Sequence, residues 1–268
     1  SVYFTRLTLF LESRYKEIRN IYIRLLAGGL VLGILVFLFP AFYGEGYDAI
    51  MALLEGESES LFRSSLFSHL GNGYLAFSLF FLCLILLKVV ASSSTTGAGG
   101  VGGIFAPTLF LGGVTGFLTS SLLNKFALLN LPDNRFVLVG MAGTMAAVMH
   151  APLTAIFLIA EITGGYSLLL PLIITSTTAY MTIKGFERHS IYHVQLAEKG
   201  ELITHDKDKA VLTMMDWKKE IERDLTSVRA SDNLGELVKT ISKSPRNIFP
   251  VVDEYNILQG VVHLDDVR

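Results

Sequence analysis

The chain has 268 residues, of which 51% are hydrophobic and only 17% are charged, and its formal net charge is −2. This composition is too apolar for an ordinary soluble domain and predicts a membrane protein. A net charge near zero gives no sign of nucleic-acid binding, so we expect no nucleic-acid partner. The single cysteine, Cys83, lies in an apolar run, which indicates a small buried hydrophobe and excludes a disulfide within the chain.

Long apolar blocks predict membrane helices, because each is near the roughly 20 residues that a helix needs to cross a bilayer. Basic residues gather between Arg6 and Arg24, beside the first block, and indicate a cytoplasmic flank. The fourth block is interrupted near His150 and Pro152, which predicts a re-entrant hairpin of the kind that borders a transport pathway. The blocks are 21–39, 74–91, 104–123, 136–160 and 168–183.

The sequence becomes charged and mixed after Lys184, and the pattern from about residue 211 predicts a small α/β unit. Apolar residues at helical spacing follow an N-cap candidate at Ser231 or Asp232. Two short β-branched runs after this helix, 248–252 and 258–263, predict strands joined by a turn.

We therefore predict a membrane domain over residues 1–195, a linker over 196–210 and an incomplete cytosolic domain over 211–268. The chain starts at Ser1, without an initiator methionine or a signal peptide, so we expect a fragment of a longer protein.

A run of small residues, 92–103, lies between two apolar blocks, and we expect it to form a loop that leads into a helix with Pro107 in its first turn. A helix that begins inside the membrane leaves backbone N–H groups unpaired and carries partial positive charge, so it can hold an anion. We expect the amides of Ile104 and Phe105 to be the donors. The alternative left open is that the glycines only permit close helix packing.

The segment Gly102-Gly103-Ile104-Phe105-Ala106-Pro107 resembles the GxFxP anion-binding motif of the CLC chloride channels and chloride/proton exchangers. Further segments, 40–50, 142–163 and 171–174, are similar to the outer loop, the paired re-entrant helices and the last full span of that family. The resemblance covers residues 1–195 in order. It implies an all-α polytopic membrane domain, one half of an inverted repeat with re-entrant helices, followed by a partial α/β CBS domain.

The resemblance also implies site residues. Ile104 and Phe105 carry over as backbone ligands of the anion, Gly102, Gly103 and Pro107 as the loop around it, and Tyr192 as a hydroxyl ligand at the inner site. It implies no catalytic residue, no metal site and no resident cofactor. The gating glutamate, the proton-coupling glutamate and the inner-gate serine of the family are expected upstream of Ser1.

The C-terminal segments Phe249–Asp253 and Gly260–Asp266 resemble pieces of a CBS domain, a module that senses adenine nucleotides. The resemblance implies that Asp266 holds a ribose. His263 stands where the motif usually has serine or threonine, so a purely structural module remains an equal alternative.

The resemblance predicts transport of chloride or a similar small anion, as a chloride/proton antiporter and in a homodimer, in the cell's inner or plasma membrane with the CBS tail in the cytoplasm. A passive chloride or fluoride channel of the same fold is the nearest alternative, and a CBS-linked divalent-cation transporter is a more distant one. We expect no enzyme, because the apolar runs hold no paired carboxylates, Ser/Lys dyad or spaced metal ligands. Lys88 either favours anions in the inner vestibule or extends its charge to the membrane surface.

Overall fold

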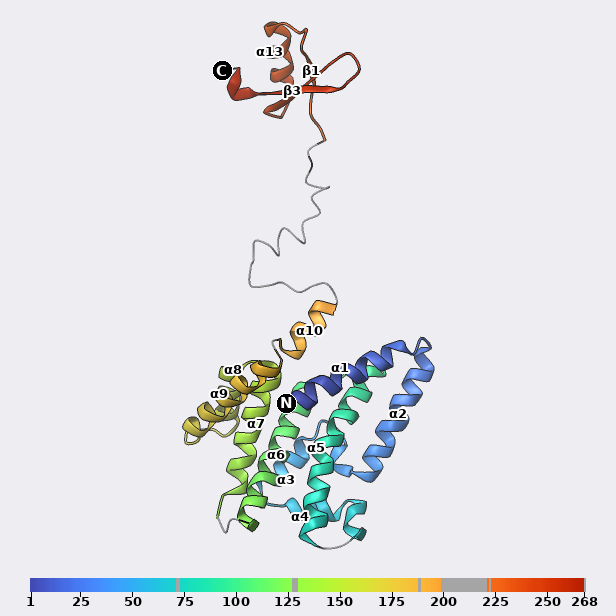
Figure 1. The fold of residues 1–268 in the computed structure, drawn as a ribbon, viewed down its shortest axis with the longest axis vertical. Coiled ribbons are helices and arrows are strands. Elements are labelled where there is room, and N and C mark those ends of the chain that lie inside the picture. Colours follow the sequence, from blue (N-terminus) through green and yellow to red (C-terminus); the bar gives the residue numbers. More distant parts are fainter. Residues whose placement is uncertain (71–72, 127–129, 188, 199–220, 222, 268) are drawn as a thin grey trace. The chain divides into compact units, whose positions relative to one another are not determined.

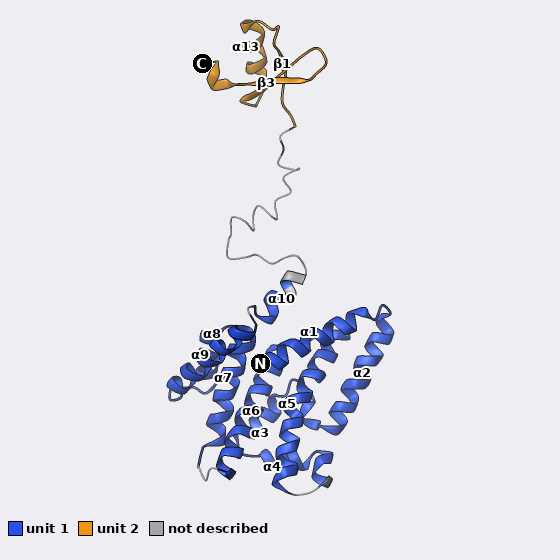
Figure 2. Cartoon of the chain, in the orientation of Figure 1, with its two compact units in different colours: residues 1–202 blue, residues 203–268 orange. Residues whose placement is uncertain are grey.

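The computed structural model describes the chain except residues 71–72, 127–129, 188, 199–220, 222 and 268. The chain divides into two compact units, residues 1–202 and residues 203–268 (Figure 2). Most of the predicted linker, 199–210, lies outside the described residues. The predicted start of the C-terminal domain at residue 211 also lies outside them. We call the two parts the membrane unit and the C-terminal unit, and each is described by itself.

The membrane unit is built from α-helices that pack side by side. In Figure 1, α5 lies between α2 and α6, and α6 packs against α7, while α1 lies along the C-terminal part of α5. Among the described residues, α2, α5 and α6 are long and apolar enough to cross a membrane. The bounds of these helices are Val2–Glu17 for α1, Ile21–Leu38 for α2, Tyr74–Gly97 for α5, Phe105–Phe126 for α6 and Asp133–Met149 for α7.

Short elements connect α2 to α5 and bury an aromatic cluster between them. The ring of Phe39 stacks on Phe80 with centroids 5.9 Å apart, and Phe62 meets Phe80 edge-on at 5.6 Å. Such aromatic pairs add to the stability gained from burying their area. The connecting elements are η1 (Pro40–Phe42), α3 (Tyr47–Leu54), α4 (Ser58–Arg63) and η2 (Leu66–Leu70).

The predicted break in the fourth apolar block is confirmed. Helix α7 ends at Met149, and α8 (Pro152–Ile162) begins with Pro152 at its N-terminus. His150 caps α7 in the left-handed conformation, with φ 56°, and its ring meets Tyr180 edge-on at 5.8 Å. A proline in the first turn of α8 and a left-handed residue at the end of α7 together explain why the two helices cannot continue as one.

Two further helices follow in the described part of the membrane unit, α9 (Leu169–Phe186) and α10 (Ile191–Glu198). Helix α9 corresponds to the fifth apolar block. It is not among the described helices that are long and apolar enough to cross a membrane, so its role as a full span stays a prediction.

Two local predictions were wrong. The run 92–103 does not form a loop throughout, because α5 continues to Gly97 and only the following residues leave the helix. Thr95 and Thr96 lie within this helix, and their hydroxyls donate hydrogen bonds to backbone carbonyls one turn earlier. In the C-terminal unit the N-cap is Asn233, not Ser231 or Asp232, and it forms a reciprocal capping box with Glu236.

The described part of the C-terminal unit contains a small three-stranded sheet and the helix α13 (Leu234–Lys243). Strand β1 (Val228–Arg229) pairs in parallel with β2 (Ile248–Val252), which pairs antiparallel with β3 (Leu258–His263), as predicted for the last two. Phe249 on β2 is fully buried. The unit ends in the short helix η3 (Leu264–Asp266).

Asp253 fixes the turn between β2 and β3, and its replacement by alanine is expected to loosen this hairpin. Its carboxylate accepts hydrogen bonds from the N–H groups of Ile257 and Tyr255, both at 2.9 Å, and from the Gln259 amide at 2.8 Å. These bonds, led by the one from Ile257, lower the pKa of Asp253 from its ordinary value of 3.8. We expect faster amide hydrogen exchange in β3 of Asp253→Ala, and no such change in the matched surface variant Glu254→Ala.

The same bonds predict a pH dependence of the hairpin. A carboxyl whose pKa is lowered in the folded state stabilises it at pH values above the unfolded pKa, and this contribution is lost as pH falls through the folded pKa. Hydrogen exchange in β3, corrected for its intrinsic pH dependence, should therefore differ between wild type and Asp253→Ala at neutral pH and converge below pH 3.8. Equal protection of the two proteins at neutral pH would contradict this assignment.

Candidate anion site

The start of α6 opens onto a cavity of about 670 Å³, which we call the loop cavity. Its walls come from α2, from the turn between η1 and α3, from the C-terminal half of α5 and from the loop before α6. Four of the predicted site residues are among those that line it: Gly102, Gly103, Phe105 and Pro107. The structure thus brings most of the predicted anion loop to one cavity.

The loop is held at both ends by local hydrogen bonds. The N–H of Gly100 donates to the Thr95 carbonyl at 2.9 Å, which closes the end of α5, and Gly99 takes a φ of 102° that favours glycine. At the other end, the Ile104 carbonyl accepts bonds from both the N–H and the hydroxyl of Thr108, at 3.1 and 2.5 Å. These two bonds fix the first turn of α6. The N–H groups of Ile104 and Phe105, at the start of this turn, have no acceptor within the helix.

The side chains of Ile104 and Phe105 face different surroundings. Ile104 is 5% exposed and belongs to a buried cluster with Val89, Val148 and Ile191, whereas Phe105 is 37% exposed and lines the loop cavity. Because the Ile104 side chain is anchored in the protein, the backbone at the start of α6 is held in place. A helix N-terminus fixed in this way can bind an anion through its amides and the partial positive charge of the helix.

Lys88, in α5, lines the loop cavity and is only 3% exposed. Its ammonium donates a hydrogen bond to the Glu45 carbonyl at 3.1 Å and lies 4.5 Å and 5.7 Å from the ring centroids of Phe110 and Phe42. The alternative that Lys88 extends to the membrane surface is therefore wrong. Gly46 leaves room for this arrangement, because a Cβ there would lie 3.0 Å from the ammonium.

Sequence reasoning missed the partners of Lys88. The Glu45 carbonyl belongs to a turn in which Gly44 and Gly46 both take positive φ values, 65° and 98°. Two glycines around an acidic residue signal a tight turn, but they do not show which side chain its carbonyl meets. Lys88 and Glu45 lie 43 positions apart.

Tyr192 and Asp266 are placed differently from the loop residues. Tyr192 is 45% exposed and is not among the residues that line the loop cavity, although its neighbour Ile191 shares a buried cluster with Ile104. Asp266 accepts a hydrogen bond from the N–H of His263 at 3.2 Å, at the end of β3. Their predicted roles as an anion ligand and a ribose ligand are not tested by these positions.

These features define a polytopic helical membrane protein with a cavity that combines a helix N-terminus and a buried lysine. The family model for voltage gated chloride channels matches residues 1–184, and the CBS domain model matches residues 219–268. The chain therefore belongs to the voltage-gated chloride channel family and carries CBS domain sequence at its C-terminus.

Curated relatives agree with this assignment. The chain is 32% identical over 180 residues to the voltage-gated ClC-type chloride channel ClcB of Escherichia coli O81 (strain ED1a), a match that covers 65% of this chain and 38% of the relative. It is 32% identical over 180 residues to a putative chloride channel protein, ClcB-like, of Ralstonia nicotianae, covering 67% and 38% of the two chains. The matched stretch thus spans somewhat more than a third of these relatives' length.

Proposed function

We propose that the whole protein to which this chain belongs transports chloride or a similar small anion across a membrane. The observation that carries the proposal is the loop cavity, in which the first turn of α6 and the ammonium of Lys88 line one space. Fixed amide dipoles bind an anion weakly enough for release, which conduction requires. The relatives are named as a chloride channel and a putative chloride channel protein, which supports chloride as the transported anion.

Within this proposal, Ile104 and Phe105 supply backbone N–H donors, the glycines 102 and 103 with Pro107 shape the loop, and Tyr192 supplies a hydroxyl. The bound species is chloride, with protons as the second transported ion of an antiporter. A passive channel is the second candidate. We also propose a homodimer in the cell's inner or plasma membrane, with the C-terminal unit on the cytoplasmic side, where Asp266 would contact an adenine nucleotide.

A flux assay tests the transport proposal. Full-length protein in liposomes is expected to release chloride down its gradient, and simultaneous recording of external pH separates the two candidates. Proton movement driven by a chloride gradient identifies an antiporter, whereas chloride flux alone identifies a channel. The absence of any anion flux from folded protein would contradict the proposed function.

The Tyr192 hydroxyl is tested by chloride binding. Tyr192→Phe removes one O–H donor and keeps the ring, so we expect chloride affinity to fall about tenfold, in line with the strength of hydrogen bonds to charged groups. Calorimetry on the purified full-length protein measures the affinity. Tyr166→Phe, at an exposed tyrosine in the turn between α8 and α9, is the matched control and should leave chloride binding unchanged.

A further inference from the structure

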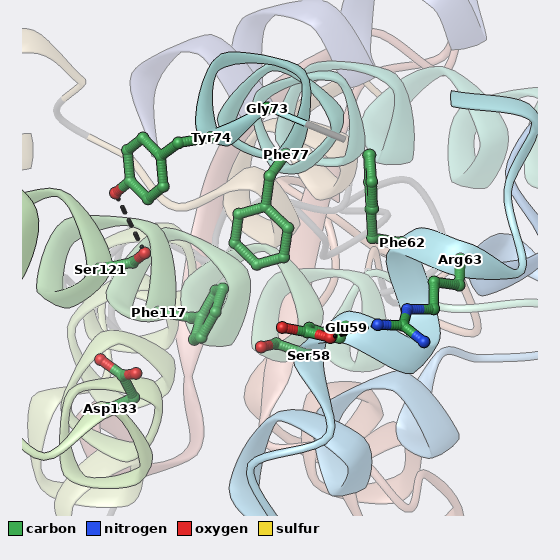
Figure 3. A pocket seen from close by; sticks show the side chains of 10 residues that line it. All are labelled: Ser58, Glu59, Phe62, Arg63, Gly73, Tyr74, Phe77, Phe117, Ser121 and Asp133. Atoms are coloured by element: carbon green, nitrogen blue, oxygen red, sulfur yellow. Dashed lines mark hydrogen bonds and ion pairs between the residues drawn. The ribbon is translucent and has the colours of Figure 1, made fainter. Parts of the chain in front are cut away.

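A second cavity, of about 750 Å³, lies apart from the residues of the loop cavity. It is bounded by α4, the start of α5, the end of α6 and the start of α7, and Figure 3 shows its side chains. We call it the aromatic pocket. The residues that line it are Ser58, Glu59, Phe62, Arg63, Gly73, Tyr74, Phe77, Phe117, Ser121 and Asp133.

Aromatic rings form a continuous wall of this pocket. Phe77 is 5.6 Å from Phe62, 6.2 Å from Phe117 and 6.3 Å from Tyr74, measured between ring centroids. The Tyr74 hydroxyl is held by Ser121 at 3.2 Å, which fixes the orientation of its ring. The volume lies in the range of pockets that hold a small organic molecule, and polar side chains share the lining with the rings.

Two carboxylates stand beside the aromatic wall, with Phe117 between them in Figure 3. Asp133 directs one oxygen to Ser120, at 2.6 Å, and to Asn124, at 3.4 Å. These neutral donors orient the carboxylate but leave its charge uncompensated by a side-chain cation in the described part of the chain. Glu59 is paired with Arg63 at 2.9 Å, and both side chains of this pair are about three-quarters exposed.

We propose that the aromatic pocket binds an organic cation, an ammonium group attached to an apolar body. The rings attract an ammonium through their negative faces, and the Asp133 carboxylate attracts its charge. The Lys125 ammonium already lies 5.5 Å from the Tyr74 ring centroid and occupies this ring, so the ligand cation would be attracted by the other rings and by Asp133. Because Glu59 and Arg63 neutralise each other, Asp133 gives the lining its net negative charge, which disfavours an organic anion.

Calorimetry with the full-length protein tests this proposal, with benzyltrimethylammonium as the probe and phenylacetate as an anion with a similar apolar body. We expect the cation to bind and the anion not to bind. Asp133→Asn keeps an oxygen for the Ser120 hydroxyl but removes the charge, and it should weaken binding of the cation about tenfold. Glu55→Gln, at an acidic residue outside the pocket, is the matched control and should bind the cation as wild type does.

A second variant keeps the test informative if Asp133→Asn disturbs the start of α7. Phe77→Leu preserves an apolar side chain but removes an aromatic face, and we expect a loss of about fivefold in affinity for the cation. The proposal is overturned if benzyltrimethylammonium does not bind at millimolar concentration, if phenylacetate binds as tightly, or if both pocket variants bind like wild type. Chloride flux is measured separately, so a failure here leaves the transport proposal untouched.

Discussion

Replacement of Lys88 by methionine is expected to lower chloride flux through the full-length protein about tenfold or more. Methionine keeps an apolar, unbranched side chain of similar length but removes the ammonium. A unit charge about 10 Å from an anion contributes about 1.7 kcal/mol at an effective dielectric constant near 20, which corresponds to more than a tenfold change in anion affinity. Lys88 lines the same cavity as the anion loop, so its charge acts on that space.

A second effect of Lys88→Met is structural. The Glu45 carbonyl would lose the donor that now lies 3.1 Å away, and an intramolecular hydrogen bond typically contributes about 0.5–1.5 kcal/mol to stability. The turn formed by Gly44, Glu45 and Gly46 would then be less well fixed. Lower stability should therefore accompany the lower flux. We expect the temperature at which half of the purified protein aggregates to be lower for Lys88→Met than for wild type.

Two matched variants separate the charge of Lys88 from its hydrogen bond. Lys88→Gln keeps an N–H donor without the charge, and Lys88→Arg keeps both. We expect the glutamine variant to regain stability but little flux, and the arginine variant to retain most of the flux. Flux in Lys88→Met equal to that of wild type, in protein shown to be folded, would contradict an electrostatic role for this residue.

The start of α6 was predictable because its sequence signals are local. A run of glycines before an apolar stretch with Pro107 near its start indicates the N-terminus of a helix, and α6 does begin at Phe105. The break at His150 and Pro152 was predictable for the same reason, since proline and a short polar interruption act on neighbouring residues. The strands β2 and β3 followed from their β-branched runs.

The contacts of Lys88 and the true end of α5 depended on more distant parts of the chain. Small hydroxyl residues have weak helix propensity and suggest a loop, but Ser94 and Thr96 are hydrogen-bonded to Tyr15 and Glu12 of α1. These contacts stabilise the last turns of α5 as a helix. Only the packing of α1 against α5 reveals them, and sequence spacing gives no indication of it.

Replacement of Gly116 by alanine is expected to destabilise the membrane unit by about 3 kcal/mol, near the upper end for an overpacked core. Gly116 lies on α6 against the backbone of α7, and a Cβ at this position would collide with the Phe136 carbonyl. Gly140 on α7 meets the Gly112 carbonyl in the same way. The two helices therefore approach through glycine on both sides, so a methyl group cannot be accommodated by rotating a side chain.

The collision at Gly116 is with backbone, so α6 and α7 must move apart to relieve it. Separation of these helices would open the buried contacts of Val137 and Met141 and displace the first turn of α6, so chloride flux should fall together with stability. The temperature at which half of the purified protein aggregates measures the stability. Gly185→Ala, at a helical glycine of α9 with no atom near its Cβ position, is the control and should be neutral or slightly stabilising. Equal aggregation temperatures for Gly116→Ala and wild type would show that α6 and α7 are not held together through this contact.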